Sequence, residues 1–509
     1  MPEARFSPHG AGNARKFMSA FTFADAGRTL AINIEWTIDT AMTSWSFETL
    51  GNAMIQVFRE GAPALVTDPW LVESAYFGSW GLERPLTERQ MGNVAASPFV
   101  WFSHGHPDHF HPPSMVHLSR ETVMLVPDHY DAEMARTLDE MGFKYQILPN
   151  KKWVTLAGGL RVLCVANENM DAILAIDAGG VLLLNKNDSP FCGEDSFFRG
   201  LVRGFARSYL LALCAYDADM INTYDGNMRR LITDPAERKP GTVWSVARTA
   251  EYLGVSAYCV SSSQHVYTRP DSAWANEFRI TWPDIQKLWT ARDVQLIGPY
   301  SVVDLSSGAV TPADSPVEAP PETRIAATNG DDDWDARLSE AEWEDVERFA
   351  RQFETLRHWQ DFVAFTVGGE TRQFLIRSSA KGKPQDQLIG VNFHVPRASL
   401  LDTVKYGYFD DLLIGNFMKT QLQNMELYPH FSPLVAKLGG NAKVFTKAQL
   451  LRFRGHFLLQ SPLAFMRFRW QLFEQHSLMP AARRWASRLG LFNALKQVRA
   501  RMVGAPKSL

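Results

Sequence analysis

The chain has 509 residues, of which 46% are hydrophobic and 21% are charged, and its formal net charge is −3. This length allows two or three domains with sizeable cores, and the composition is that of a globular protein. No apolar run approaches the roughly 20 residues of a membrane-spanning helix, and no secretory signal is evident.

The four cysteines are scattered and form no C-x-x-C pair. They predict neither a disulfide framework nor a structural zinc site, and a Rieske-type iron–sulfur signature is absent from the sequence. We therefore expect a cytoplasmic protein in a reducing compartment.

Alternating and apolar runs predict a sheet of short strands in the first half of the chain. Residues 1–45 form an N-terminal extension with one alternating strand at 29–36. A hairpin over 53–67 ends at Asp68. Sheets packed face to face and flanked by helices would make a four-layer sandwich. Further strands are predicted at 98–102, 123–127, 160–165, 172–177, 181–184 and 256–260, and helices at 132–141, within 197–219 and at 248–253.

The composition changes over 310–335, where Pro, Ala, Glu, Thr and Asp dominate, and we interpret this segment as a linker. A capping box at Ser339 and Glu342 then opens an α+β module over 336–440. Segments 393–397 and 410–417 faintly resemble sterol-carrier-like domains, which would imply lipid binding. The predicted strands of the module are 362–367, 372–378 and 387–395, and its later helices are 400–406 and 412–425.

The tail, residues 441–509, is strongly basic, with 13 Lys and Arg residues and one acid, Glu474. Basic helices with interleaved apolar residues suit an anionic membrane surface, which would make this a peripheral membrane protein, or an acidic carrier domain. The alternative is a solvated face packed onto the acidic remainder of the chain. No nucleic-acid recognition motif is found, so no nucleic-acid partner is expected.

The most informative segment is a histidine-rich loop that follows a predicted buried strand. His104, His106, Asp108 and His109 form an H-x-H-x-D-H motif, and His111 adds a further histidine. Neutral imidazoles and a carboxylate are ligands for zinc, iron or manganese. A solvated histidine-rich loop is the weaker alternative, because so many histidines directly follow a core strand. We predict two histidines on one metal ion and the Asp–His pair on a second.

Three later residues also follow predicted strands and are candidate ligands: Glu168, Asp188 and His265. Taken singly, each has an ordinary alternative as a turn residue, a helix cap or a hydrogen-bonded histidine. Their recurrence at successive strand ends favours a shared metal centre.

The segment after His265 has two interpretations, which the sequence supports equally. Tyr267, Arg269 and Asp271 can form a substrate-facing loop beside the metal centre. They can also form a structural turn that an Arg–Asp pair stabilises.

The loop motif, with Asp68 ending an earlier strand and Asp188 and His265 ending later ones, resembles the metallo-β-lactamase superfamily over 46–309. The resemblance implies an α/β fold, the αβ/βα four-layer sandwich, with two metal ions at one edge of its sheets. Asp68 would then support the ligands or the substrate.

Carried over residue by residue, the resemblance implies a ligand set for each ion. His104 and His106 would hold the first ion. Asp188 would bridge the two ions. The second ion would be held by Asp108, His109, the bridging Asp188 and His265.

One position departs from the hydrolytic members of the superfamily, which usually have a Gly-His-Thr turn where this chain has Glu168. A carboxylate adds negative charge and a hard oxygen, which favours iron or manganese over zinc. This pattern is similar to the diiron oxygenase branch, typified by the β-hydroxylase of chloramphenicol biosynthesis. Segments 66–71 and 265–276 resemble, more weakly, CMP-N-acetylneuraminate hydroxylase.

The resemblance implies a non-haem diiron monooxygenase with two iron ions, in which Asp108 and Glu168 are the catalytic residues. It would use O₂ and an external electron donor to hydroxylate or N-oxygenate a small molecule, free or bound to a carrier protein. The alternative is a dinuclear zinc or manganese hydrolase acting on an ester, lactone, amide or phosphodiester, with Asp108 as ligand or general base. A third hypothesis gives the main role to the C-terminal half, as a lipid- or carrier-binding module.

Overall fold

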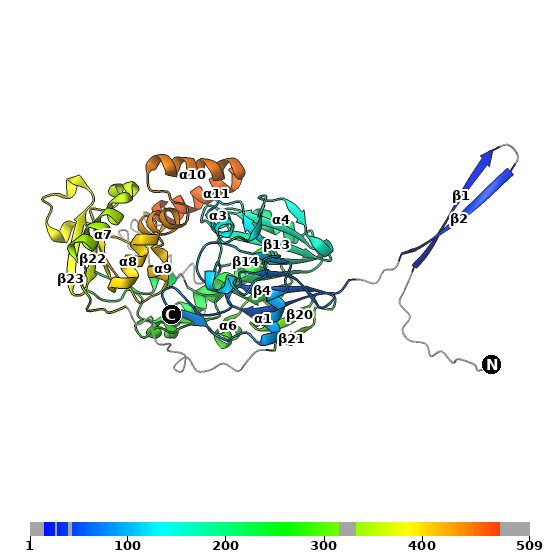
Figure 1. The fold of residues 1–509 in the computed structure, drawn as a ribbon, viewed down its shortest axis with the longest axis horizontal. Helices are drawn as coiled ribbons and strands as arrows, with labels where there is room; N and C mark the ends of the chain where they lie inside the picture. The colour runs from blue at the N-terminus through cyan, green and yellow to red at the C-terminus, as the bar shows by residue number, and fades with distance from the viewer. Residues whose placement is uncertain (1–14, 26–27, 39–42, 217, 315–331, 479–509) are drawn as a thin grey trace, which may run out of the picture.

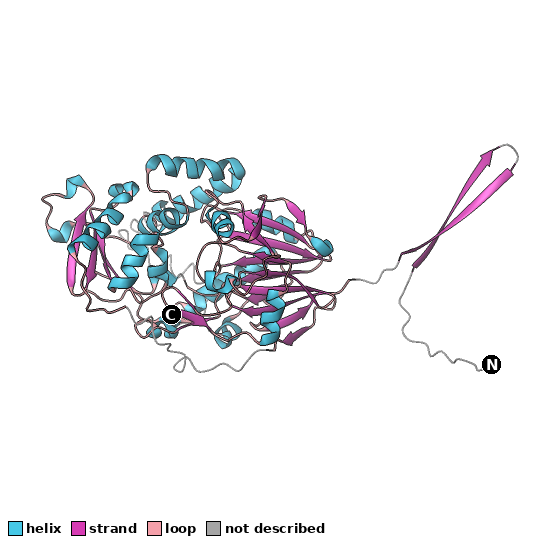
Figure 2. Cartoon of the chain, in the orientation of Figure 1, coloured by secondary structure: helices cyan, strands magenta, loops and turns pink. Residues whose placement is uncertain are grey.

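The computed structural model describes residues 15–25, 28–38, 43–216, 218–314 and 332–478. Two large sheets face each other, with helices on their outer faces, and a smaller sheet with its own helices lies beside them (Figures 1 and 2). Near the start of the chain, β1 (Arg15–Asp25) and β2 (Arg28–Ile38) pair as an antiparallel hairpin. This confirms the strand predicted in the N-terminal extension.

The first large sheet has eight strands, parallel on one side and antiparallel on the other. The loops that leave its parallel strands emerge at one common edge, where the histidine-rich loop lies. In spatial order the strands are β10 (Lys144–Leu148), β9 (Val123–Pro127), β8 (Phe99–Trp101), β5 (Ala62–Thr67), β4 (Met54–Arg59), β3 (Trp45–Gly51), β20 (Ser301–Asp304) and β21 (Val310–Pro312).

The second large sheet has seven strands and is also mixed. Asp188 directly follows its central strand. In spatial order the strands are β11 (Trp153–Thr155), β12 (Arg161–Ala166), β13 (Ala172–Ala178), β14 (Val181–Asn187), β15 (Ser208–Ala212), β17 (Ala257–Val260) and β19 (Gln295–Ile297).

Alternation along the strands builds the layers, because successive side chains of a strand point to opposite faces. In β9, Leu125 points into the core between the sheets, whereas Met124 and Val126 point outward. In β14, Leu183 points inward and Leu182 outward. Helices cover both outer faces: α1 (Glu88–Ala95) and α3 (Glu133–Glu140) on the first sheet, and α4 (Asp195–Val202), α5 (Lys239–Leu253) and α6 (Trp282–Leu288) on the second.

A three-stranded antiparallel sheet lies beside the two large sheets. It consists of β6 (Ser74–Ala75), β7 (Trp80–Leu82) and β18 (His265–Tyr267). The pairing of β18 with β7 places His265 beside a chain segment nearly 200 residues earlier.

The C-terminal module, which we define as residues 332–478, has its own apolar core and a five-stranded sheet. One strand of that sheet, β16 (Thr223–Tyr224), comes from the metallo-β-lactamase-like region, so the two parts interlock. Its other strands are β25 (Lys419–Gln423), β24 (Gly390–His394), β22 (Phe362–Val367) and β23 (Glu370–Leu375), and its helices include α7 (Glu340–Gln352), α8 (Arg397–Tyr406) and α9 (Asp410–Ile414).

Two helix predictions are wrong in part. Within 197–219, α4 is followed by the strand β15, whose apolar run is buried on both faces and so carries no strand alternation. Within 412–425, α9 ends at Ile414 and the strand β25 follows. The predicted linker begins with strand β21, and its residues 315–331 lie outside the described part of the chain.

The module ends in α10 (Lys447–Gln460), α11 (Pro462–Phe473) and a short π-helical turn at Glu474–Leu478. None of the helices in the described ranges is both long enough and apolar enough to span a bilayer. The arginines from Arg483 to Arg501 lie outside the described residues, so the partner of the basic tail stays a prediction.

Candidate metal centre

The histidine-rich loop leaves β8 and forms a tight turn with buried polar side chains. The amides of His109 and Phe110 both donate to the carbonyl of His106, at 2.9 and 2.8 Å. The Phe110 ring packs edge-on against Phe102, with centroids 5.0 Å apart, which anchors the turn in the core. The candidate ligands of the loop are therefore all buried: His104, His106, Asp108 and His109.

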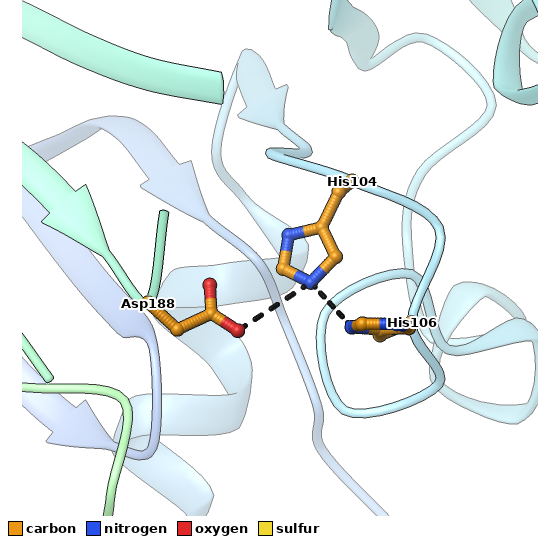
Figure 3. A group of neighbouring side chains, drawn as sticks. All are labelled: His104, His106 and Asp188. Carbon is orange, nitrogen blue, oxygen red and sulfur yellow. Dashed lines mark hydrogen bonds and ion pairs between the residues drawn. The ribbon is translucent and has the colours of Figure 1, made fainter. Parts of the chain in front are cut away.

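Three side chains meet where the loop faces the end of β14 (Figure 3). His104 Nε2 lies 2.9 Å from His106 Nδ1 and 3.6 Å from Asp188 Oδ2. One ligand atom from each of the three lies within 4.8 Å of the other two. Two imidazoles and a carboxylate at this spacing can hold one metal ion.

Asp188 also faces the second half of the loop. Its Oδ2 lies 3.7 Å from His109 Nε2, which in turn lies 3.4 Å from Asp108 Oδ2. Burial raises the pKa of Asp188, and its Oδ1 has no hydrogen-bond partner among the described residues. A carboxylate that faces two imidazole groups and leaves one buried oxygen unpaired fits a shared metal ligand.

Each loop histidine has a polar partner behind it, on the ring nitrogen that points away from Asp188. Such partners fix the orientation and tautomer of a metal-binding imidazole. The pairs are Ser103 Oγ with His104 Nδ1 at 2.9 Å, Asp68 Oδ2 with His109 Nδ1 at 3.1 Å, and Asp410 Oδ2 with His106 Nε2 at 3.0 Å.

Neighbouring acids favour the charged form of two of these histidines. Burial lowers the pKa of His109, but the three aspartates around it raise it to about 10. Burial also lowers the pKa of His106, but Asp410 raises it to about 9. The pKa of His104 lies well below its usual range because this ring is buried. Metal binding here would release protons, since only neutral imidazole is a ligand.

Hydrogen bonds fix both carboxylate oxygens of Asp108. Tyr76 donates its hydroxyl to Oδ1 at 2.5 Å, and Asn52 donates Nδ2 to Oδ2 at 2.8 Å. Burial raises the pKa of Asp108, but the charge of His109 and these hydrogen bonds lower it overall. Asp108 is therefore an ionised carboxylate with a fixed orientation.

His265 lies on the wall of the same cavity. Its ring stacks on Trp80, and its Nδ1 has no hydrogen-bond partner in the described part of the chain. Burial and the nearby charge of Arg279 lower its pKa to about 3. His265 is thus a neutral imidazole with an unpaired nitrogen, as a metal ligand must be.

The cavity in front of these residues has a volume of about 160 Å³ and lies between the two parts of the chain. Asp108, Asp188 and His265 line one wall, and Asp410 and Lys437 of the C-terminal module line the other. The remaining lining is largely aromatic and aliphatic. A small pocket lined largely by apolar side chains, with a few convergent polar groups, is typical of a small-molecule site.

Glu168 is not part of the group that can hold a metal ion. Its carboxylate forms an ion pair with Arg469 of α11. Of the other predicted residues, Tyr267 lines the cavity and accepts a hydrogen bond from Asn416 at 3.2 Å. Arg269 and Asp271 pair with each other at 2.7 Å, as in the structural alternative.

Several residues of the site lack any sequence signal of their own. Tyr76, Trp80 and Asn52 lie in loops or short strands outside the motif. Asp410 and Lys437 come from the C-terminal module, some 300 residues after the loop. Only the acidic pair at Asp410 and Asp411, beside a helix start, could have drawn attention.

No family model matches the chain. A curated protein of Mycolicibacterium smegmatis, described as "Putative Rieske 2Fe-2S iron-sulfur protein", is 30% identical over 83 residues. That match covers 16% of this chain and 16% of that protein, so it is too short to transfer a function.

Solved structures with a similar fold match about half of the chain. A metallo hydrolase from Ignicoccus hospitalis is 15% identical and covers 53% of this chain and 98% of its own, with a TM-score of 0.34. An isothiocyanate hydrolase from Delia radicum gut bacteria is 11% identical and covers 53% of this chain and 100% of its own, with a TM-score of 0.35. The metallo-β-lactamase fold protein YhfI from Bacillus subtilis is 12% identical and covers 53% of this chain and 99% of its own, with a TM-score of 0.32.

The prediction of a diiron monooxygenase is wrong. It rested on Glu168 as an extra carboxylate ligand, and Glu168 pairs with Arg469 instead. The external electron donor was expected for that oxygenase reaction and stays an untested prediction.

The arrangement of the sheets, helices and histidine-rich loop identifies the fold. Two mixed sheets pack face to face, helices cover both outer faces, and the histidine-rich loop lies at one edge beside the end of β14. The chain therefore has a metallo-β-lactamase fold, with His104, His106 and Asp188 grouped to hold a metal ion.

Proposed function

We propose that the chain is a metal-dependent hydrolase that cleaves an ester, lactone, amide or phosphodiester in a small substrate. The observation that carries the proposal is the convergence of His104, His106 and Asp188, of which His106 and Asp188 line the cavity. In this proposal residues 46–309 perform the chemistry, and the α+β module closes the cavity.

The donor set fits a dinuclear zinc or manganese centre. His104 and His106 would hold one ion, and Asp108, His109 and His265 the other, with Asp188 between them. A divalent ion, when bound, supplies Lewis acidity and lowers the pKa of a coordinated water. Imidazole nitrogens and few carboxylates suit zinc, and carboxylate oxygens suit manganese.

The chain's own residues prepare the site for a polar substrate. The Tyr76 hydroxyl stays protonated, because burial and the charge of Asp108 raise its pKa well above the usual range. It therefore donates to Asp108 and fixes that carboxylate at the cavity wall.

Lys437 places a positive charge on the opposite wall. Burial lowers its pKa, but nearby carboxylates such as Asp171, 4.0 Å away, raise it overall. A cation facing the site can orient an anionic or carbonyl group of the substrate.

The experiment is a metal analysis combined with a hydrolysis screen. The purified full chain is loaded with Zn²⁺ or Mn²⁺ and assayed with p-nitrophenyl acetate, a γ-lactone, a p-nitroanilide and bis(p-nitrophenyl) phosphate. We expect turnover of one class, lost on chelation and restored by metal. Asp188→Asn should lower the turnover at least 100-fold.

The matched control is Asp402→Asn, an exposed acid on α8 that should leave turnover unchanged. Full activity in Asp188→Asn, or no turnover of any class by the metal-loaded wild type, would contradict the proposal.

A further inference from the structure

We infer that Asp410 of the C-terminal module is a positioning residue of the metal centre, so that the centre is complete only when the module is docked. The inference rests on the proposed metal site and names a residue outside the metallo-β-lactamase fold. The module is thus a working part of the site in addition to a cover for the cavity.

The geometry places Asp410 directly behind a predicted ligand. Its Oδ2 lies 3.0 Å from His106 Nε2, and both side chains are buried. The other ring nitrogen, His106 Nδ1, faces His104 Nε2 at 2.9 Å. A carboxylate that accepts from Nε2 keeps the proton there and leaves the Nδ1 lone pair directed at the ion.

The loop alone gives His106 no such partner. His104 is hydrogen-bonded by Ser103, and His109 pairs with Asp68, both within the metallo-β-lactamase fold. Among the described residues, the carboxylate partner of His106 is Asp410, which lies across the boundary between the two parts of the chain.

Hydrogen bonds to the residues directly after the C-terminal end of α9 fix the position of Asp410. Asn222 donates Nδ2 to the carbonyls of Asn416 and Met418, at 2.9 and 2.7 Å. Ser79 donates to the carbonyl of Gly415 at 2.5 Å. The segment that follows Asp410 is therefore hydrogen-bonded to Asn222 and Ser79 of the metallo-β-lactamase-like region.

A link between metal binding and docking follows from this arrangement. A ligand that binds only the docked form stabilises that form, by a free energy that grows with the logarithm of its concentration relative to its Kd. Loss of Asp410 should weaken metal binding and reduce the stabilisation that metal gives the whole chain.

The test uses the full-length protein with Zn²⁺ and Co²⁺ as probes. Asp410→Ala should weaken Zn²⁺ binding about 10- to 100-fold in competition with a chromophoric chelator, as loss of such partners does in other metal sites. Asp410→Asn keeps an acceptor oxygen and should restore part of the affinity. The visible spectrum of bound Co²⁺ should shift in Asp410→Ala, because the His106 ring is no longer fixed.

Asp402→Ala is the matched control, since it removes an exposed acid from the same module. It should leave the affinity, the spectrum and the rise in melting temperature on adding Zn²⁺ unchanged. Circular dichroism shows whether each variant is folded, and the Asn variant decides the matter if Asp410→Ala does not fold.

The inference is overturned if Asp410→Ala matches the wild type in Zn²⁺ affinity and Co²⁺ spectrum. Where Asp410→Ala does not fold, the same result with Asp410→Asn overturns it. It is also overturned if the wild type binds no metal. Hydrolysis plays no part in these measurements. A wild type that binds metal but hydrolyses nothing would refute the proposed function and leave the role of Asp410 standing.

Discussion

The imidazole of His265 lies flat against the indole of Trp80, with ring centroids 3.4 Å apart and ring planes 5° apart. The two residues are brought together by the pairing of β18 with β7. Stacking fixes the plane of the imidazole, and the low pKa of His265 keeps it neutral. Trp80 therefore holds a candidate ligand ready for a metal ion.

Replacement of Trp80 should weaken the second metal position. We expect Trp80→Ala to lower the affinity for the second ion about tenfold or more, because the His265 ring becomes free to rotate. Trp80→Phe, which keeps an aromatic face, should lower it less. Titration with Co²⁺, followed by absorption, measures both ions separately.

A matched stacked pair serves as the control for Trp80. Trp359 and His430 of the C-terminal module stack with centroids 3.5 Å apart and planes 8° apart. Trp359→Ala should leave both metal affinities unchanged. Equal affinities in Trp80→Ala and Trp359→Ala would show that the stacking has no role in metal binding.

The sequence predicted the part of the site that depends on local geometry. His104 to His109 follow one strand directly, and Asp188 follows another, so the positions of these residues depend on strand ends that the apolar runs reveal. The same runs predicted a four-layer sandwich, and the H-x-H-x-D-H motif carried the resemblance to the metallo-β-lactamase superfamily. Glu168 also follows a strand, but a contact from α11, 300 residues later, determines its partner.

Long-range docking accounts for what the sequence could not show. Asp410 reaches the site through packing of the module, and Trp80 through the antiparallel pairing of β7 with β18. Neither follows from a spacing pattern. The strand β15 was mistaken for helix because short apolar runs buried on both faces have no period.

Arg269 joins three parts of the chain, and its removal should destabilise the fold. Its side chain is buried, donates to Asp271 at 2.7 and 3.0 Å and to Asp332 at 2.9 Å, and lies over the Phe417 ring at 3.9 Å. Removing Arg269 takes the cation from Asp332, which is 7% exposed, and from Asp271, which is 25% exposed and still accepts a hydrogen bond from Trp334. The cost is therefore about 3 kcal/mol, the lower end of the range for breaking a buried pair. We expect Arg269→Ala to lower the free energy of unfolding by about this amount in denaturant titrations.

The variant Arg269→Lys should recover little of this loss, because an ammonium group cannot bind a carboxylate with two parallel hydrogen bonds. Arg348→Ala is the control, since Arg348 pairs with Asp345 on an exposed helix face. Exposed pairs contribute little to stability. An Arg269→Ala chain as stable as Arg348→Ala would contradict the role of the buried pair.

The four cysteines should be unreactive in the folded chain. All four are buried, and burial raises the pKa of Cys164 and of Cys214 to about 12. The thiolate is the reactive form, and with a pKa of about 12 only about one thiol in a thousand is ionised at pH 9, so their modification should stay slow over pH 7 to 9. We expect no fast reaction with Ellman's reagent at pH 8 and four thiols after unfolding in guanidinium. A thiol that reacts in the native chain as fast as glutathione would disprove this.

Gly193 packs closely against the backbone of α11, and a side chain at this position should weaken the contact between α11 and the metallo-β-lactamase-like region. Its φ is +83°, and a Cβ atom would collide with the carbonyl of Ala464 in α11. Backbone of this kind also costs a non-glycine residue about 1–2 kcal/mol. We expect Gly193→Ala to speed tryptic cleavage after Arg467, measured by mass spectrometry.

Gly180→Ala separates backbone strain from the collision. Gly180 has a similar φ of +87°, but no atom of the described residues lies within 4 Å of the point that its Cβ would occupy. It should share the strain of Gly193→Ala and leave cleavage after Arg467 at the wild-type rate. If both variants are cleaved equally fast, the contact between Gly193 and α11 does not hold the helix in place. If only Gly193→Ala is cleaved faster, this contact fixes α11 and, with it, the ion pair between Arg469 and Glu168.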